Sequence, residues 1–166
     1  MSFEGIKLLL TEKFGNGVIF GEETGGMQPA LLIEPDRIAE VCLELRNNEK
    51  TYFDFLSSIT GVDYGVESSR FGVVYHLASI PYQTQLTLKI SKENSRDLND
   101  LPIFPSISSV YRTADWHERE AYDLVGIFFE GHPDLRRILL PDDWEGFPLR
   151  KDYKNAEFYK GIRIDF

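Results

Sequence analysis

The chain has 166 residues, of which 42% are apolar and 27% are charged, and its formal net charge is −9. This composition is typical of a soluble globular protein; the length suits one domain burying about 70% of its unfolded surface, and no apolar run approaches the roughly 20 residues that cross a bilayer. The chain has a single cysteine, Cys42, so it can form no internal disulfide, and one thiolate is too few to hold an iron–sulfur cluster. An acidic chain also repels phosphate groups, so nucleic acid and anionic membrane surfaces are disfavoured and protein is the expected partner.

Hydrophobic spacing and turn residues divide the first part of the chain into elements. In chain order the sequence predicts a helix over 3–14, strands over 18–20 and 30–34, a helix over 35–47, a short helix at 55–59, strands over 71–80 and 84–91, and a short helical turn at 107–111. The last two strands are joined by three residues and are expected to form a hairpin. Cys42 lies on the apolar stripe of its helix and His76 lies within a strand, so both are interpreted as structural.

A further helix of about three turns is predicted from Trp116 to Gly126. Asp115 and Glu118 have the spacing of a capping box, and Gly126 is placed as the left-handed residue that ends a helix. At 3.6 residues per turn, two carboxylates share a face with large apolar groups; the residues on this face are Trp116, Glu120, Asp123 and Leu124. We therefore expect partly buried acids that pair with Arg136 and Arg137.

The order of these elements favours an α+β fold with two layers, in which helices cover one face of a mostly antiparallel sheet. The sequence predicts one α+β domain over residues 1–135. Residues 136–166 have few periodic apolar positions and are expected to form an extended C-terminal tail that lies on partner surfaces. Beyond about Asp142 this tail is expected to be mobile in the isolated protein.

Residues 118–153 resemble a known signature. The residues that carry the resemblance are Glu118, Arg119, Glu120, Asp123, His132, the run 136–139, the run 141–146 and the run 148–153. They look like the signature of the 30 kDa subunit family, also called the C subunit, of NADH:quinone oxidoreductase, which is respiratory complex I. The resemblance implies a non-catalytic structural subunit of the peripheral arm that helps to assemble the junction between the quinone site and the iron–sulfur clusters. The isolated chain is expected to be inactive, since electron transfer from NADH to quinone and proton pumping belong to the whole complex.

The resemblance also implies where cofactors and partners lie. This chain is expected to bind no cofactor or metal, while iron–sulfur clusters, FMN and quinone are held by other subunits. The expected partners are the D subunit, which forms the quinone site, and the cluster-bearing B and I subunits. The first residues are acidic, unlike a mitochondrial transit peptide, so the expected location is the cytoplasmic side of a bacterial inner membrane.

No catalytic residue is expected on this interpretation, and the candidate site is an interface with partner subunits. Its predicted residues are Glu118, Arg119, Glu120, Asp123, His132, Arg136, Arg137, Asp142, Trp144, Phe147, Arg150, Lys151 and Tyr153. The first seven are expected to hold the junction and the others to attach the tail, since tryptophan, tyrosine and arginine are favoured at interface hot spots.

Two alternatives remain open at this point. One is a homologous subunit of a membrane-bound hydrogenase or of another quinone-reducing dehydrogenase. The other is a separate acid–base or metal-dependent enzyme that uses His117, Glu120, Asp123 and His132, because these residue types can ligate a metal. A network of salt bridges among these groups and nearby arginines is the competing interpretation.

Overall fold

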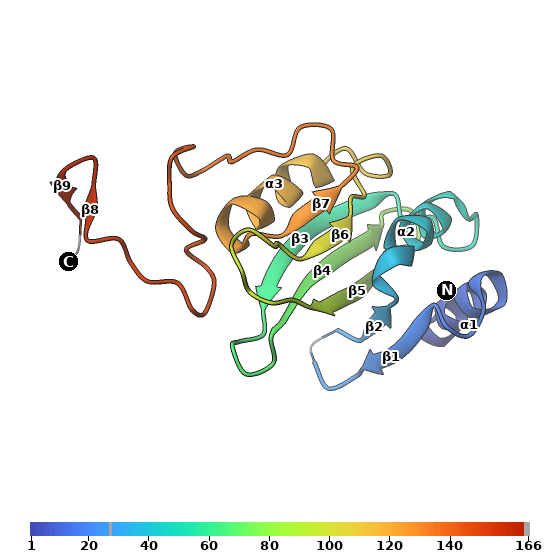
Figure 1. The fold of residues 1–166 in the computed structure, drawn as a ribbon. Helices are drawn as coiled ribbons and strands as arrows, with labels where there is room; N and C mark the ends of the chain where they lie inside the picture. Colours follow the sequence, from blue (N-terminus) through green and yellow to red (C-terminus); the bar gives the residue numbers. More distant parts are fainter. Residues whose placement is uncertain (27, 165–166) are drawn as a thin grey trace.

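The computed structural model describes residues 1–26 and 28–164 of the chain. A five-stranded sheet forms the centre of the molecule (Figure 1), with strand order β1-β2-β5-β4-β3. Its strands are β1 (Ile19–Glu23), β2 (Ala30–Ile33), β3 (Phe55–Asp63), β4 (Arg70–Ser79) and β5 (Thr84–Glu93). Within this sheet only the β2–β5 pair is parallel, so the sheet is mostly antiparallel, as the sequence predicts.

Helices cover one face of this sheet. They are α1 (Phe3–Phe14), α2 (Ile38–Asn47), which the short 3₁₀ helix Pro35–Arg37 precedes, and α3 (Ala114–Val125). Alternate residues of β4 and β5 are buried beneath the helices, among them Tyr75 and Leu88, which are fully buried. This alternation is the period-2 pattern of a sheet with one covered face, and it confirms the two-layer α+β prediction.

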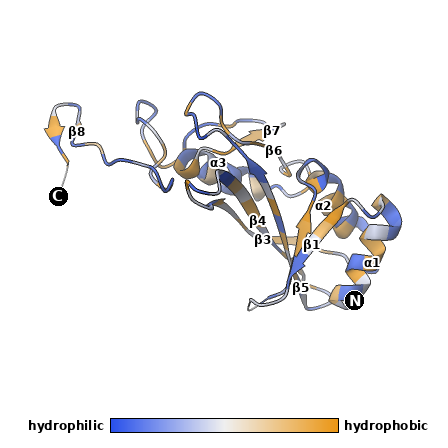
Figure 2. Cartoon of the chain, turned by 60° about the horizontal axis from the view of Figure 1, so that its bottom comes forward, coloured by the Kyte–Doolittle hydropathy of each residue, from blue (hydrophilic) through white to orange (hydrophobic). Residues whose placement is uncertain are grey.

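Two pairs of short strands complete the fold. β6 (Ile103–Pro105) and β7 (Phe128–Glu130) run parallel to each other beside α3. β8 (Phe158–Tyr159) and β9 (Ile162–Arg163) form an antiparallel hairpin far from the sheet, at the end of the C-terminal segment (Figure 1). Figure 2 shows apolar residues on β8, where Phe158 is 60% exposed. No helix within residues 1–26 and 28–164 is long and apolar enough to cross a membrane.

The short helix predicted at 55–59 is wrong, because this segment is the start of β3. A bulge between Leu56 and Ser58 shifts the register of β3 against β4, so that Leu56 and Ile59 both face the core. Their spacing of three residues imitates a helical period. The short helical turn predicted at 107–111 is present as a single turn, in which the carbonyl of Ile107 accepts the backbone N–H groups of Val110 and Tyr111.

The helix predicted from Trp116 to Gly126 is present, and Gly126 ends it in the left-handed conformation with φ 74°. Its capping box is absent, because the helix begins at Ala114 and Thr113 occupies the N-cap position. The expected buried face is also partly wrong. Asp123 is fully buried, but Trp116 is 62% exposed and Glu120 is exposed.

Small residues explain which side of α3 faces the sheet. A Cβ added to Gly61 of β3 would lie 3.1 Å from the Cβ of Ala121. Helix and sheet therefore approach closely at these two small residues, and the large Trp116 is exposed. Close packing, rather than the size of the apolar side chains, decides the buried face.

The segment after residue 135 has two parts. Residues 136–153 contact the body of the molecule, and both Phe147 and Arg150 are buried there. Residues 154–164 lead away from the body toward the β8–β9 hairpin (Figure 1). The contacts made by 136–153 place the departure of the chain from the body near residue 154.

Candidate interaction site

The carboxylate of Asp123 organises the chain that follows β7. Its Oδ2 accepts the backbone N–H groups of Ile138 at 3.0 Å, Leu139 at 2.7 Å and Leu140 at 2.9 Å, and its Oδ1 accepts Arg137 Nη1 at 2.8 Å. Burial alone would raise the pKa of Asp123, but these four donors outweigh it and hold the pKa below its ordinary value. Three consecutive N–H groups form a concave anion site. In this chain the anion is the protein's own side chain.

Arg150 holds the next part of the segment against the end of α3. Its Nε donates to the carbonyl of Val125 at 2.8 Å, and its Nη2 donates to the carbonyl of Gly126 at 3.2 Å. These are carbonyls at the helix C-terminus, where a cation is favoured. The guanidinium carbon of Arg150 also lies 4.8 Å from the ring centroids of both Phe71 and Phe147. Arg150 thus joins the helix, the sheet and the C-terminal segment.

A third contact joins the C-terminal segment to the end of β3. Arg96 donates to both carboxylate oxygens of Asp63 and also to Asp152, and the backbone N–H of Lys151 donates to Asp63 Oδ2 at 2.7 Å. Burial opposes ionisation of Asp63, but Arg96 and the N–H groups of Lys151 and Gly65 overcome this effect and lower its pKa to about 2. Asp63 therefore stays ionised near neutral pH and holds the C-terminal segment at the end of β3.

Glu118 is buried on the inner side of α3 and, unlike Asp63 and Asp123, binds no arginine among the described residues. Its Oε2 accepts Ser106 Oγ at 2.6 Å and its Oε1 accepts the backbone N–H of Ile107 at 2.8 Å. His132 Nε2 lies 4.0 Å from Oε2 and donates to the carbonyl of Asp115 at 3.1 Å. Burial raises the pKa of Glu118 to about 7, and the two donors reduce this shift only in part.

The residues predicted for the interface therefore fall into two groups. One group is used inside the chain: Glu118, Arg119, Asp123, His132, Arg137, Phe147 and Arg150 have buried or nearly buried side chains. The other group remains accessible to a partner: Glu120, Arg136, Asp142 and Lys151 are exposed, while Trp144 and Tyr153 are half-buried and joined by a hydrogen bond of 3.1 Å. The sequence pattern indicates the right segment but does not separate the two groups.

An exposed tryptophan marks the accessible part of this region. Trp116 is 62% exposed, and the guanidinium carbon of Arg119 lies 5.1 Å from its ring centroid. Arg119 Nε in turn donates to the carbonyl of Arg136 at 3.3 Å. The Arg136 side chain is 67% exposed and binds Asp134, which is also exposed. We call the exposed Trp116 and Arg136, which the buried Arg119 connects, the Trp116 surface; exposed tryptophan and arginine are the residue types that dominate binding energy at interfaces.

Sequence reasoning missed several residues of this site. Arg96, Asp63 and Ser106 lie in segments that no pattern marked, and each contributes a side-chain contact to the region. Arg96 has φ 65°, an uncommon conformation for this residue type, and no sequence pattern predicts it. Trp116 was included in the pattern but was expected to be buried.

The geometry does not support a metal centre at His117, Glu120, Asp123 and His132. Asp123 and His132 are engaged with the chain itself, and Glu120 is directed to solvent. Within residues 1–26 and 28–164, no three histidine, cysteine or acidic side chains converge as metal ligands would.

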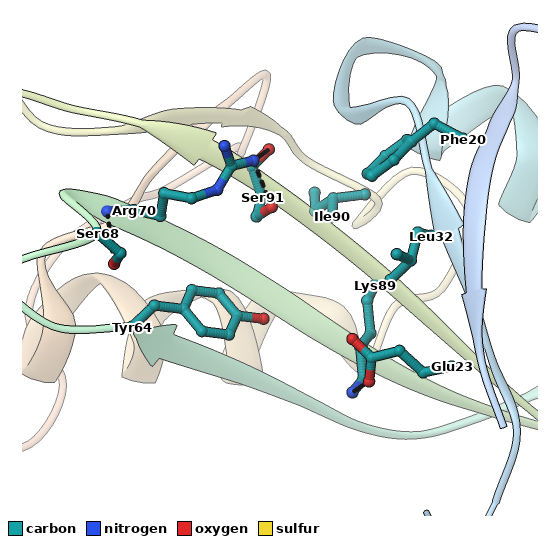
Figure 3. Close-up of a pocket in the computed structure, with 9 residues that line it drawn as sticks. All are labelled: Phe20, Glu23, Leu32, Tyr64, Ser68, Arg70, Lys89, Ile90 and Ser91. Carbon is teal, nitrogen blue, oxygen red and sulfur yellow. Dashed lines mark hydrogen bonds and ion pairs between the residues drawn. The ribbon is translucent and has the colours of Figure 1, made fainter. Parts of the chain in front are cut away.

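The uncovered face of the sheet carries a groove of about 390 Å³ (Figure 3). Phe20, Leu32 and Tyr64 give it apolar walls. Its charged groups are already paired, because Lys89 binds Glu23 on its rim and Arg70 binds Glu93 at 3.2 Å. The groove lies on the opposite side of the sheet from α3, and no unpaired charge among its lining residues indicates a ligand.

The chain is similar to known proteins along most of its length. A family model described as "Respiratory-chain NADH dehydrogenase, 30 Kd subunit" matches residues 31–159. Relatives named as the C subunit of NADH-quinone oxidoreductase include one from Chloroherpeton thalassium, 43% identical over 162 residues, and one from Salinispora tropica, 52% identical over 140 residues. The matches cover 95% and 81% of this chain but only 63% and 54% of those relatives. A relative of the same name from Chlorobium phaeobacteroides is 38% identical over 161 residues, which are 95% of this chain and 92% of the relative.

A solved structure shares the fold. It is described as the membrane-bound sulfane sulfur reductase, an archaeal respiratory membrane complex, and one of its chains matches with a TM-score of 0.72 and 24% identity. The match covers 91% of this chain and 85% of that chain. At this identity the similarity concerns the fold alone.

Proposed function

Because the chain belongs to the family of the 30 kDa subunit of respiratory-chain NADH dehydrogenase, we propose that it is a non-catalytic structural subunit of a membrane-associated NADH:quinone oxidoreductase. In this role it helps to assemble the junction at which electrons pass from the iron–sulfur clusters to quinone. One observation carries the proposal: several charged residues of the family signature, among them Asp123, Arg137 and Arg150, are used inside the chain to fix the shape of residues 131–153. A surface that is fixed before binding loses little conformational entropy when a partner covers it.

The partners of this surface are other subunits of the complex. We place the D subunit, which forms the quinone site, and the cluster-bearing B and I subunits against the Trp116 surface and the C-terminal segment, and we assign FMN, iron–sulfur clusters and quinone to partner chains. The location that fits is the cytoplasmic side of a bacterial inner membrane. The part that wraps a partner begins near residue 154, where the chain leaves the body and carries exposed apolar residues such as Phe158 and Ile162.

A component of a different membrane-bound electron-transfer complex is the second candidate. The archaeal respiratory structure contains a chain of the same fold. The fold is compatible with both functions, since function lies in the partners rather than in the fold.

The test is recovery of the assembly from gently solubilised membranes with an affinity-tagged chain. We expect quinone-site and cluster-bearing subunits to be retained, the eluate to absorb as iron–sulfur clusters do, and an FMN-containing NADH-oxidising subunit to be present. Replacing Trp116 with alanine should reduce recovery. The matched control is Leu8→Ala, which removes an equally exposed apolar side chain, 59% accessible, from α1. Recovery of the tagged chain alone would contradict the proposal, and recovery of clusters without the FMN subunit would favour the second candidate.

A further inference from the structure

A chain of hydroxyl groups connects the buried Glu118 to the surface. Ser106 Oγ lies 2.6 Å from Glu118 Oε2 and 2.8 Å from Ser108 Oγ, and Ser108 is partly exposed. Each serine hydroxyl can donate one hydrogen bond and accept others, so the direction of donation along the chain can reverse. The backbone N–H of Ser108 also donates to Ser106 Oγ at 3.1 Å, which holds this hydroxyl in place.

No cation accompanies the Glu118 carboxyl in the described part of the chain. His132 is the nearest basic side chain, but its Nδ1 accepts the backbone N–H of Asp134 at 3.0 Å while its Nε2 donates to the carbonyl of Asp115. The ring thus carries its hydrogen on Nε2, and Nδ1 has no room for a second hydrogen in this arrangement. Among the residues that the structure describes, no lysine or arginine nitrogen lies within 4.0 Å of Glu118.

The other titratable groups that face Glu118 are acids. Asp115 lies on the same helix, Cys42 approaches from α2 and Tyr75 from β4. Both Cys42 and Tyr75 are fully buried, and the Tyr75 hydroxyl has no hydrogen-bond partner among the described residues. None of these groups offers a positive charge, so the described partners of an ionised Glu118 are the hydrogen-bond donors Ser106 and Ile107, which compensate its burial only in part.

We propose that Glu118 is a buried proton-binding site that exchanges its proton with solvent through Ser106 and Ser108. In the neutral acid, Glu118 Oε2 donates to Ser106 Oγ, which donates to Ser108 Oγ. On release, the Glu118 proton passes to Ser106 Oγ, the Ser106 hydrogen passes to Ser108 Oγ, and the Ser108 hydrogen passes to a water molecule. The hydroxyl donors then point toward the carboxylate, and one proton has left the protein.

The proton state of this site should affect how α3, β6 and the loop with His132 fit together. The folded pKa of Glu118, about 7, lies above the ordinary value of 4.5, so the folded protein holds this proton over a range in which the unfolded chain has lost it. The contribution of Glu118 to stability is therefore complete below pH 4.5 and declines as pH rises toward 7. Above pH 7 the contact between α3, β6 and the loop with His132 encloses the negative charge of Glu118, with no lysine or arginine beside it among the described residues.

Infrared difference spectroscopy on the full chain tests the site. The C=O band of a protonated carboxyl group is recorded from pH 4 to 9 for the natural protein and for Glu118→Gln, which keeps the shape but cannot titrate. We expect a band that disappears with a midpoint near pH 7, that Glu118→Gln lacks, and that the matched control Glu120→Gln retains, because Glu120 is exposed two residues away. A natural protein whose Glu118 band has a midpoint at or below pH 4.5 would overturn the proposal.

A second variant tests the hydroxyl path and remains informative where the glutamine variant does not fold. Ser106→Ala keeps the carboxyl but removes a donor that favours the ionised form. We expect the midpoint of the band to move to higher pH, and proton exchange of the carboxyl with solvent to slow. An unchanged midpoint and exchange rate would show that Ser106 has no part in the site.

Discussion

Asp123 Oδ1 and Arg137 Nη1 lie 2.8 Å apart and join α3 to a loop fourteen positions later in the chain. The same carboxylate binds three consecutive backbone N–H groups of that loop through Oδ2. A single side chain on the helix therefore fixes the path of the backbone beyond β7. Charged residues of the signature such as Asp123 and Arg137 thus bind groups of their own chain, and these bonds give the surface offered to a partner its shape.

Replacing Asp123 with asparagine should lower the free energy of unfolding by about 3 kcal/mol, because it leaves the Arg137 guanidinium with a neutral acceptor and weakens three backbone hydrogen bonds. Urea unfolding followed by tryptophan fluorescence measures the change. Glu120→Gln is the matched control on the same helix, and its effect should stay within about 0.5 kcal/mol because Glu120 is exposed. Equal effects of the two variants would refute the structural role of Asp123.

The adjacent arginines 136 and 137 should separate assembly from stability. Arg137→Ala removes the partner of a buried carboxylate and should cost about 3 kcal/mol of stability. Arg136→Ala removes an exposed side chain and should change stability by less than about 0.5 kcal/mol, yet it should weaken capture of partner subunits. Thermal unfolding and affinity capture of each variant give the two quantities. An Arg136 variant that captures partners normally would remove this residue from the interface.

Two glycines with left-handed backbone provide a test of the packing at the end of α3. A Cβ at Gly126 would collide with the ring of Phe147, whereas a Cβ at Gly131 would meet no atom within 4 Å. Gly131→Ala should therefore show only the conformational cost of about 1 kcal/mol, and Gly126→Ala should cost at least about 1 kcal/mol more. Urea midpoints of both variants measure the difference. Similar midpoints would mean that Phe147 does not lie on Gly126 in solution.

Acid should weaken the connection at Asp63. Its folded pKa of about 2 lies below the ordinary 3.8, so the unfolded chain takes up this proton first, and the stabilisation is present above pH 3.8 and lost as pH falls toward 2. The expected loss is about 2 kcal/mol, measured as the free energy of unfolding between pH 6 and 2. Asp63→Asn is less stable at neutral pH, but its curve should be flatter over the same acid range. Parallel curves for the two proteins would show that Asp63 titrates normally.

Amide exchange should locate the true start of the mobile tail. The sequence places it near Asp142, but Leu149 donates its backbone N–H to the carbonyl of Leu124 at 2.9 Å and Arg150 is buried. We expect the amides of residues 138–140 and 149 to be protected in the isolated protein, and those of residues 154–157 to exchange rapidly. Exchange at Leu149 as fast as at residue 155 would show that the mobile tail begins near Asp142, as the sequence predicts.

Local pattern was sufficient for most elements and for the position of the site. The apolar period of α2, the alternation of β5 and the left-handed Gly126 are properties of neighbouring residues, so they could be predicted without coordinates. β3 was mistaken for a helix because the bulge after Leu56 changes which residues face the core, and only the pairing with β4 reveals that bulge. β6 and β7 were missed because three-residue strands carry too little pattern.

By itself the sequence determined that this is a two-layer α+β protein and that residues 118–153 carry its family character, because both depend on composition, periodicity and order along the chain. Only the tertiary structure decided which charged residues form hydrogen bonds and ion pairs within the chain and which remain exposed. Asp123 is satisfied by backbone groups that arrive from a later loop, Glu118 has no cation beside it among the described residues, and Trp116 is turned outward by the close approach of Gly61 and Ala121. Burial and hydrogen-bond partners depend on residues far apart in the chain, and no local spacing specifies them.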